Sequence, residues 1–271
     1  MKPPNPSLAL NPDGRMWTAS SLESGLLVPA GKNCIYANRP HIVGKPDKSQ
    51  EDVLKGVRVT GDYVQLNDGI PKRPLNIPDM EIELRKHRGA KLFTVADAVQ
   101  GYHQLALDQK SRERCAIWTP LGLMLPTRLW MGIKNAGTIY QEAVTGSLDT
   151  MPEGPRKQTS NYMDDFLTSG KSFEEYRANT RAFFEMCRAR GITLNPAKTR
   201  LGFERAKLLG REVDGQSIKV HSDNLRALRE CRRPEDVSQL KSFLGICAYA
   251  RKHVKNFAFH SERLTNLTRK K

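Results

Sequence analysis

Apolar and polar positions follow two different periods along the chain, and these periods predict both strands and helices. Residues 91–97 (KLFTVAD) are compact, β-branched and aromatic, which is typical of a strand. Residues 121–131 are mixed apolar residues interrupted by a glycine and a proline, which indicates strands joined by a turn. Residues 201–220 predict further short strands around Asp214-Gly215, a dipeptide typical of tight hairpins.

Three later segments have the helical period, the last of them in the C-terminal tail. Asn135 is able to cap the first helix, because its short side chain accepts hydrogen bonds from first-turn N–H groups. Ser172 and Glu175 form a capping box that begins the second helix, and Gly191 ends it. The apolar faces of the three helices consist of Ala136, Ile139, Ala143, Val144 and Leu148, then Tyr176, Thr180, Phe183, Phe184 and Cys187, then Leu240, Phe243, Leu244, Cys247 and Val254. Strands and helices recurring in this order predict an α+β fold.

The net charge narrows the choice of partners. The chain has 271 residues, with 44 Lys and Arg against 29 Asp and Glu, so its formal charge is +15. Residues 221–271 carry 12 basic and 5 acidic side chains, so nearly half of the net charge lies in this tail. A basic surface concentrated in one segment favours a nucleic acid partner over charge that serves solubility alone.

The cysteines and the apolar runs indicate the compartment. The five cysteines are scattered, with no Cys-x-x-Cys pair and no zinc-finger spacing, which is typical of free thiols in a reducing compartment. The N-terminus lacks the apolar stretch of a signal peptide, and no apolar run approaches the ~20 residues needed to span a bilayer. We therefore expect an intracellular protein without a membrane partner.

Two acidic segments carry the candidate chemistry. Asp164 and Asp165 are adjacent within residues 161–167 (NYMDDFL), and neighbouring carboxylates repel each other unless a divalent cation binds them. Asp97 ends the predicted strand 91–97, where a charged residue among apolar neighbours needs a partner or a metal. Taken singly, an Asp-Asp pair is more often a polar turn, and a lone aspartate is more often capped or paired. Together they supply three carboxylates from two predicted strands, which suits a two-metal site for phosphoryl transfer.

Six ordered segments resemble the motifs of gypsy-class LTR-retrotransposon reverse transcriptases. The family's first palm motif is an aspartate followed shortly by Gly-Tyr-His-Gln. The third motif here has the sequence Tyr-Met-Asp-Asp, which is also seen in retroviruses. The second motif usually reads Phe-Gly-Leu-x-Asn-Ala-Pro-x-x-Phe-Gln. The matching segments are 58–67 (fingers), 93–104, 132–141 and 161–167 (palm motifs), 191–198 with 208–210 (fourth motif and primer grip) and 242–265 (thumb). Each is weak alone, but the ordered set is highly specific for the polymerase portion of a reverse transcriptase.

The resemblance implies roles in catalysis for the residues at the motif positions. Asp97 and Asp164 would be the main metal ligands, Asp165 would be the third carboxylate, and the Ala98 carbonyl would assist them. Lys198 would be the catalytic proton donor to the leaving pyrophosphate. Thr199 follows Lys198 where the family has a second Lys.

The resemblance also implies contacts with the nucleotide and with the primer–template. Tyr102 would be the steric gate whose ring blocks a ribose 2′-OH, although alone it reads as a core tyrosine. Arg58 would contact the triphosphate, helped by either Lys45 or Lys48, between which the loop length does not decide. The other implied nucleotide contacts are Met131 and Gly132, and the implied primer or template contacts are Tyr162, Met163, Gln141, Leu208, Leu209 and Gly210.

Three positions and one segment depart from the family's usual pattern. Trp130 and Gly137 stand where Pro is usual, and Val64 stands where Arg is usual after Asp-Tyr. Residues 156–161 are polar where the family has an apolar strand, so we expect either a short strand that is solvated on one side or a less well packed palm. None of these departures removes a metal ligand.

The resemblance implies the right-hand architecture of polymerases. The fingers would span residues 1–90 and 105–130, the palm 91–104 and 131–215, and the thumb 216–271. The palm would be an antiparallel sheet backed by two helices. The thumb would be helical, and its basic surface would grip the backbone of the duplex.

The implied function is RNA- and DNA-directed DNA polymerisation. A primer 3′-OH would attack the α-phosphate of a deoxynucleoside triphosphate with the help of two Mg²⁺ ions, for which Mn²⁺ can substitute. The partners would be a template–primer duplex, deoxynucleoside triphosphates, and the RNase H and integrase domains of a parent polyprotein. The chain itself has no signature of those domains, so degradation of an RNA strand is not expected. The compartment would be the cytoplasm, within a retroelement particle, with the nucleus as a second location.

Two alternative functions remain open from the sequence. A domesticated or inactive reverse-transcriptase-like module that binds nucleic acid without copying it fits the charge, but leaves the complete set of three carboxylates unexplained. An RNA-dependent RNA polymerase of related palm geometry fits the carboxylates, but a bulky gate at Tyr102 would reject ribonucleotides.

Overall fold

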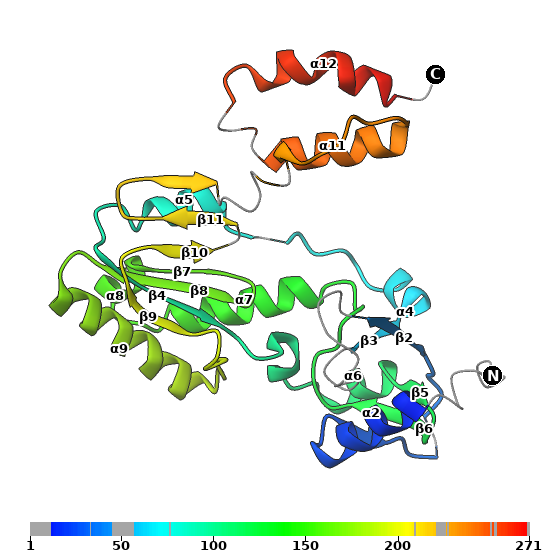
Figure 1. The fold of residues 1–271 in the computed structure, drawn as a ribbon. Helices are drawn as coiled ribbons and strands as arrows, with labels where there is room; N and C mark the ends of the chain where they lie inside the picture. Colours follow the sequence, from blue (N-terminus) through cyan, green and yellow to red (C-terminus); the bar gives the residue numbers. More distant parts are fainter. Residues whose placement is uncertain are drawn as a thin grey trace.

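Helices and antiparallel sheets alternate along the chain, which confirms the predicted α+β class (Figure 1). The structure is a computed structural model that describes residues 12–32, 34–44, 57–75, 77–208, 210–220, 226, 228–249, 251 and 254–269. The helices are α2 (Pro12–Glu23), α4 (Val64–Asp68), α5 (Met80–Arg85), η1 (Gly101–Gln104), α6 (Gln109–Arg114), α7 (Ala136–Leu148), α8 (Glu153–Lys157), α9 (Phe173–Arg190), α11 (Val237–Tyr249) and α12 (Phe257–Leu267). The strands are β1 (Leu27–Pro29), β2 (Arg39–Gly44), β3 (Val57–Asp62), β4 (Leu92–Asp97), β5 (Ile117–Thr119), β6 (Gly122–Pro126), β7 (Thr159–Tyr162), β8 (Asp165–Gly170), β9 (Arg200–Phe203), β10 (Ala206–Leu208), β11 (Arg211–Val213) and β12 (Ile218–Val220). Across these ranges, no helix is both long enough and apolar enough to cross a bilayer.

A four-stranded antiparallel sheet in the order β7-β8-β4-β9 forms the centre of the fold. The strand predicted at residues 91–97 is its β4, which pairs with β8 on one side and with β9 on the other. Neighbouring side chains on a strand point to opposite faces of the sheet. Ala96 of β4 therefore belongs to one apolar cluster and Phe93 to another.

The two faces of this sheet are covered by different elements. Helices α7 and α9 cover one face, where Phe166 of β8 and Phe183 of α9 lie with ring centroids 5.3 Å apart. Helix α5 and the three-stranded sheet β10-β11-β12 lie over the other face, where Leu84 and Leu208 pack against Phe93. Burial on both faces makes the central sheet a rigid support for the strand ends.

A third apolar cluster lies in the N-terminal lobe, to one side of the central sheet (Figure 1). Its sheet has the order β1-β6-β5, and β2 pairs only with β3 among the described strands. Ile117, Met124 and Trp130 form the middle of this cluster. Trp17 of α2 meets the Trp130 ring edge-on, with 6.0 Å between the ring centroids. Trp130, which stands where the family usually has Pro, is thus fully buried core.

The C-terminal helices α11 and α12 form a hairpin that lies apart from the central sheet (Figure 1). The apolar face predicted for this region is confirmed, because its residues line a groove of about 320 Å³ between the two helices. Phe243, Leu244 and Cys247 come from α11, and Val254 comes from the connection. Leu240 is also buried.

The predicted helix ends are confirmed for α9 but not for α7. The Ser172 hydroxyl accepts a hydrogen bond from Glu175 N at 3.2 Å, and Gly191 ends the helix with a φ of +68°. Asn135 precedes α7, but its side chain does not cap the helix. It accepts from Arg73 N and donates to Pro71 O instead, which ties the incoming segment to the start of α7.

The prediction of several strands within residues 121–131 was wrong in its extent. Only β6 forms there, and its hairpin partner β5 precedes the turn. The later residues make single bridges and turns, such as the bridge between Ala106 and Arg128. Met124 and Trp130 of this stretch pack into the N-terminal cluster, Leu129 packs into the cluster that α7 and α9 cover, and Leu121 is exposed.

The polar segment 156–161 differs most from the expectation. Only Thr159–Tyr162 forms a strand, β7, so the strand is short as predicted. Its side chains are buried rather than solvated, because Thr159 and Ser160 are 0% exposed and Asn161 is 4% exposed. The prediction of a solvated face was therefore wrong.

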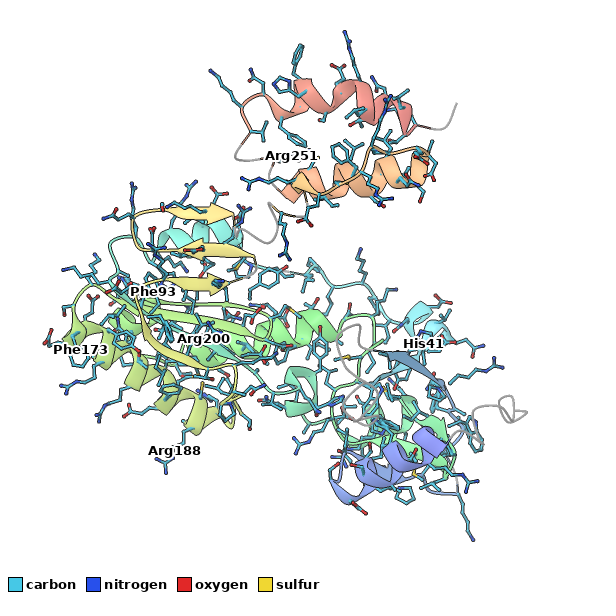
Figure 2. All side chains as sticks on the ribbon, viewed as in Figure 1. His41, Phe93, Phe173, Arg188, Arg200 and Arg251 are labelled. Carbon is cyan, nitrogen blue, oxygen red and sulfur yellow. The ribbon has the colours of Figure 1, made fainter. Side chains whose placement is uncertain are left out.

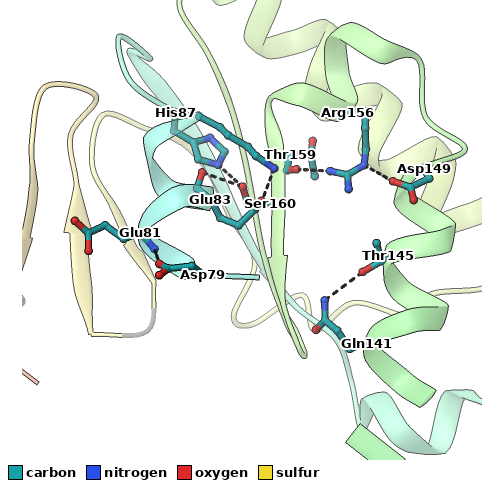
Figure 3. A network of polar contacts seen from close by, with 11 residues as sticks. Asp79, Glu81, Glu83, His87, Gln141, Thr145, Asp149, Arg156, Thr159 and Ser160 are labelled. Carbon is teal, nitrogen blue, oxygen red and sulfur yellow. Dashed lines mark hydrogen bonds and ion pairs between the residues drawn. The ribbon is translucent and has the colours of Figure 1, made fainter. Parts of the chain in front are cut away.

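Hydrogen bonds from neighbouring elements explain how a polar strand can be buried (Figure 3). The two ring nitrogens of His87 lie 2.9 Å from the Ser160 hydroxyl and 2.8 Å from the Ser169 hydroxyl. The Thr159 hydroxyl lies 2.7 Å from that of Thr168 on β8. Buried polar groups are costly mainly when they lack partners, so this network replaces the apolar packing.

Candidate active site

Two of the three candidate carboxylates face each other across neighbouring strands. Asp97 is the last residue of β4, and it pairs in register with Asp165, the first residue of β8. Residues directly opposite each other in an antiparallel pair point to the same face. Both carboxylates therefore lie on the face that carries Phe93 and Val95, away from α7 and α9.

Asp164 lies in the turn between β7 and β8. Met163 takes a left-handed conformation with a φ of +51°, which reverses the chain and breaks the alternation of side-chain directions. Met163 N donates to Oε1 of Gln141, at 2.9 Å, and Ala98 N donates to the Asp164 carbonyl, at 2.8 Å. The turn is thus tied to α7 and to the end of β4, which holds all three acidic residues at one edge of the sheet.

Lys198 supplies positive charge beside the carboxylates. Its Nζ lies 3.1 Å from both carboxylate oxygens of Asp97. Burial raises the pKa of Asp165 above its usual value, the charges of Asp97 and Asp164 raise it further, and Lys198 opposes the rise. Repulsion of this kind indicates that the three carboxylates share one electrostatic environment.

The donor set fits divalent cations of the Mg²⁺ type. Carboxylate oxygens are the ligands that hard cations prefer, and carboxylates that repel each other gain most from such an ion. Among the residues that the structure describes, no three His, Cys, Asp or Glu side chains converge on one point, and Lys198 holds Asp97. Asp97, Asp164 and Asp165 are the side chains that would hold such an ion.

An open pocket of about 530 Å³ adjoins the carboxylates on the same face of the sheet. Figure 2 labels two of the lining residues, Phe93 of β4 and Arg200 of β9. The basic residues of the lining are Lys198, Arg200, Arg205 and Lys207. The acidic residues of the lining are Asp97, Asp165 and Glu212, so basic side chains outnumber acidic ones by four to three. Arg200, Arg205 and Lys207 were not predicted, although the four basic residues spaced along 198–207 were a usable signal.

Tyr102, the predicted steric gate, lies in η1 close to the carboxylates. Gln100, which precedes η1, has a φ of +48° and turns the chain back after β4. The half-buried ring of Tyr102 meets the Tyr140 ring edge-on, with 5.3 Å between the centroids. Burial raises the pKa of Tyr102, and the charge of Asp164 raises it further.

Met131 and Gly132 form a turn that segment 58–67 holds in place. Gly132 has a φ of +103°, and a Cβ there would collide with the Gly61 carbonyl, so this position requires glycine. Gly61 N donates to Met131 O at 3.1 Å, and Asn67 Nδ2 donates to Gly132 O at 2.8 Å. The predicted fingers segment and the second motif are therefore in direct contact.

The remaining predicted contacts have different environments. Gln141 is 2% exposed, and its side chain accepts the hydrogen bond from Met163 N. Leu208, the last residue of β10, is 3% exposed and packs in the same apolar cluster as Phe93. Tyr162 and Met163 are half-buried at the β7–β8 turn. Gly210 joins β10 to β11 with a φ of +70°. Residues outside the described ranges are Lys45, Lys48, Leu209 and, for its side chain alone, Arg58 of β3.

Comparisons with known proteins agree on one family. The model of the reverse transcriptase (RNA-dependent DNA polymerase) family matches residues 48–213. The retrovirus-related Pol polyprotein from transposon opus of Drosophila melanogaster is 29% identical over 248 residues, which cover 92% of this chain and 24% of that polyprotein. The corresponding polyprotein from transposon gypsy is 28% identical over 211 residues, which cover 78% and 20%. The chain thus spans about a quarter or less of the length of these curated relatives.

Solved structures share the fold. The foamy viral protease–reverse transcriptase in complex with double-stranded DNA matches with a TM-score of 0.82 and 21% identity, over 95% of this chain and 44% of that chain. The same kind of protein in complex with an RNA/DNA hybrid matches with a TM-score of 0.77 and 20% identity, over 93% and 32%. The α+β polymerase fold is thereby confirmed. The chain belongs to the reverse transcriptase family, and its relatives include the Pol polyproteins of Drosophila gypsy-type LTR transposons.

Proposed function

We propose that this chain is a DNA polymerase that copies RNA and DNA templates. The observation that carries the proposal is the in-register pair Asp97–Asp165, with Asp164 in the adjoining turn and a basic pocket beside them. Phosphoryl transfer requires from the protein mainly positioning and the stabilisation of negative charge. An acidic edge held on a buried sheet, next to basic side chains, meets both requirements.

The three carboxylates would hold two Mg²⁺ ions, for which Mn²⁺ can substitute. Asp97 and Asp164 would be the main ligands, Asp165 would be the third carboxylate, and the Ala98 carbonyl would assist. When bound, these ions would activate the primer 3′-OH and hold the triphosphate. Lys198, released from Asp97, would then donate a proton to the departing pyrophosphate.

The other motif residues would position the reactants. Tyr102 would exclude a ribose 2′-OH, and Arg58, with Lys45 or Lys48, would contact the triphosphate above the turn at Met131 and Gly132. Tyr162 and Met163 would face the primer end, and Gln141 would act through its hydrogen bond to Met163 N. The turn at 208–210 would hold the primer backbone.

The domain roles follow the family. Fingers at 1–90 and 105–130, a palm at 91–104 and 131–215, and a thumb at 216–271 would enclose a template–primer duplex. The foamy viral proteins of similar fold were solved with double-stranded DNA and an RNA/DNA hybrid. RNase H and integrase domains of a parent polyprotein would act beside this chain in a cytoplasmic particle, with the nucleus as a second location.

Primer extension tests this proposal. The wild-type chain should extend a primer on an RNA template and on a DNA template with Mg²⁺ and deoxynucleotides, and should discriminate against ribonucleotides. Asp164→Asn should abolish extension, while Asp149→Asn, a change at an exposed aspartate paired with Arg156, should not. Equal use of ribonucleotides would overturn the gate assignment.

A binding module without polymerase activity is the second candidate. The observation that favours it is the Lys198–Asp97 ion pair, in which the lysine amine donates to both carboxylate oxygens of a proposed metal ligand. Retained duplex binding with no product from the wild type, in Mg²⁺ or in Mn²⁺, would favour this candidate. Loss of the pair by Lys198→Gln without any gain in metal binding would count further toward it.

A further inference from the structure

Tyr140 lies within the site but has no role among those described above. It is on α7, at the position where the family's usual second motif has phenylalanine. Its side chain is 2% exposed, and its ring meets that of Tyr102 edge-on. A phenylalanine would keep these ring contacts. The hydroxyl is therefore the group that needs an explanation.

The hydroxyl of Tyr140 lies beside the Asp164 carboxylate. A Cβ added to Gly101 would collide with both the Tyr140 hydroxyl and Oδ1 of Asp164, so the two oxygens border the same small space. Burial raises the pKa of Tyr140 most, and the negative charge of the neighbouring Asp164 raises it further. The phenol thus keeps its proton next to a carboxylate acceptor.

The contact is close but not well formed. The Tyr140 hydroxyl is buried, and within the described part of the chain no group meets it in ordinary hydrogen-bond geometry. A buried donor without a good acceptor costs free energy.

We propose that Tyr140 is a positioning residue whose hydroxyl donates a hydrogen bond to the Asp164 carboxylate and fixes that carboxylate as a ligand for divalent ions. The proposal rests on the proposed function. Oδ1 of Asp164, which borders the same space as the hydroxyl, would be the acceptor. Groups behind metal ligands commonly set the orientation of the ligand and the affinity of the site.

The test compares Tyr140→Phe with Tyr176→Phe. Tyr176 is a matched control, because it is a buried tyrosine on the same face of the central sheet whose hydroxyl lies 2.8 Å from Thr94 and not beside the carboxylates. The probe is Mn²⁺, titrated into protein bound to template–primer without nucleotide, and the readout is loss of the free-ion EPR signal. Tyr140→Phe should raise the Kd for Mn²⁺ about tenfold, and Tyr176→Phe should leave it unchanged.

The possible outcomes separate this inference from the proposed function. An unchanged Kd in Tyr140→Phe would overturn the inference, as would equal weakening by both variants, which would indicate a loosened core. Primer extension by Tyr140→Phe should recover at saturating Mn²⁺ and fall at limiting Mn²⁺, because only the ion's affinity is reduced. If the wild type neither binds Mn²⁺ nor extends primers, the proposed function itself is contradicted. Asp164→Asn shows the Mn²⁺ binding expected when one metal ligand is lost.

Discussion

At the scale of single residues, the candidate site combines mutually repelling acids with one basic partner. Asp97, Asp164 and Asp165 lie at one edge of the sheet, and Lys198 Nζ lies 3.1 Å from the first of them. Without a bound cation, this arrangement costs free energy that the rest of the fold has to offset. Substitutions at the site should therefore affect stability and activity in opposite directions.

Asp165→Asn should stabilise the metal-free protein. The folded-state pKa of Asp165 is raised, so this carboxyl contributes stability at acid pH that is lost as the pH rises through the folded-state pKa. At pH 7 the amide should therefore increase the free energy of unfolding by about 0.5 kcal/mol, the scale of partly exposed charge interactions. Urea unfolding with a chelator at pH 7 and at pH 3 measures this, and the gain should vanish at pH 3. A lower stability than the wild type at pH 7 would contradict this expectation.

Gly132 should tolerate no side chain, whereas Gly137 should tolerate one. Alanine at 132 would combine a φ of +103° with a collision against the Gly61 carbonyl, so we expect a destabilisation of about 2 kcal/mol. Alanine at 137 would meet only ordinary contacts, such as the Tyr102 hydroxyl at 3.5 Å, and should stabilise α7 by about 0.5–1 kcal/mol. Chemical denaturation of the two variants gives the comparison, and equal effects would contradict it.

At the scale of elements, the central sheet is held partly by polar contacts that the sequence does not reveal. Strand β7 is buried through the hydroxyl and imidazole network around His87, which joins it to the segment after α5 and to β8. Burial lowers the pKa of His87 to about 3, with a smaller effect from Lys86. The network therefore depends on a neutral imidazole.

Acid should weaken the protein through His87. The folded-state pKa lies below the ordinary value of 6.5, so the stability of the neutral form is fully present above that value and is lost as the pH falls toward about 3. The loss should approach roughly 1.4 kcal/mol per pH unit below about pH 6. His87→Gln keeps hydrogen-bonding groups but does not titrate, so its unfolding should depend less on pH between 6 and 4.

The control for this prediction is His260→Gln, a change at an exposed histidine of α12. Its pH profile should match that of the wild type. His103, whose pKa burial lowers to about 4, contributes a similar slope, so His87→Gln should reduce the pH dependence without abolishing it. Identical profiles for wild type and His87→Gln would show that β7 does not depend on the imidazole.

Local signals predicted several elements of the fold from the sequence. Strand β4, the hairpin at Asp214-Gly215 and helix α9 with its Ser172 cap all carry their determinants within a few residues. The three candidate carboxylates were predicted to lie together because the order of the motifs along the chain resembles that of the family. The burial of β7 was not predictable, because its partner His87 lies far away in sequence and a polar run gives no sign of such a partner. The same applies to Asn135 and Gln141, whose side chains bond to distant backbone groups.

At the scale of the whole molecule, exposed basic side chains lie on two separate surfaces, the α11–α12 hairpin and the outer side of α9. The α11–α12 hairpin stands apart from the central sheet and carries exposed Lys241, Lys255 and Arg263 (Figure 1). Helix α9 also carries exposed arginines, on the outer side of the layer that covers the sheet, as Arg188 illustrates in Figure 2. Only the first of these surfaces belongs to the proposed thumb.

Neutralising the two surfaces should therefore have different effects on duplex binding. The triple change of Lys241, Lys255 and Arg263 to Gln should weaken binding and reduce the salt dependence of log K by about 0.9 for each phosphate that the variant no longer neutralises. The matched triple change of Arg177, Arg181 and Arg188 to Gln alters the net charge equally and should leave the slope unchanged. Fluorescence anisotropy with a labelled template–primer across a salt series measures both, and equal slopes would contradict the assignment of the thumb.

The pairing of β4 with β8 also determines what an insertion or a deletion in this strand would do to the fold. Phe93, Val95 and Asp97 share one side of β4, whereas Thr94 and Ala96 share the other, so a slip by one residue would exchange the apolar core positions and the acidic position together. A chain with one residue deleted from or inserted into this strand would not yield a well-folded molecule with misdirected carboxylates. Correct folding of β4 therefore requires the register that aligns the acids. Folded but inactive molecules should arise from substitutions, and not from single-residue insertions or deletions within the strand.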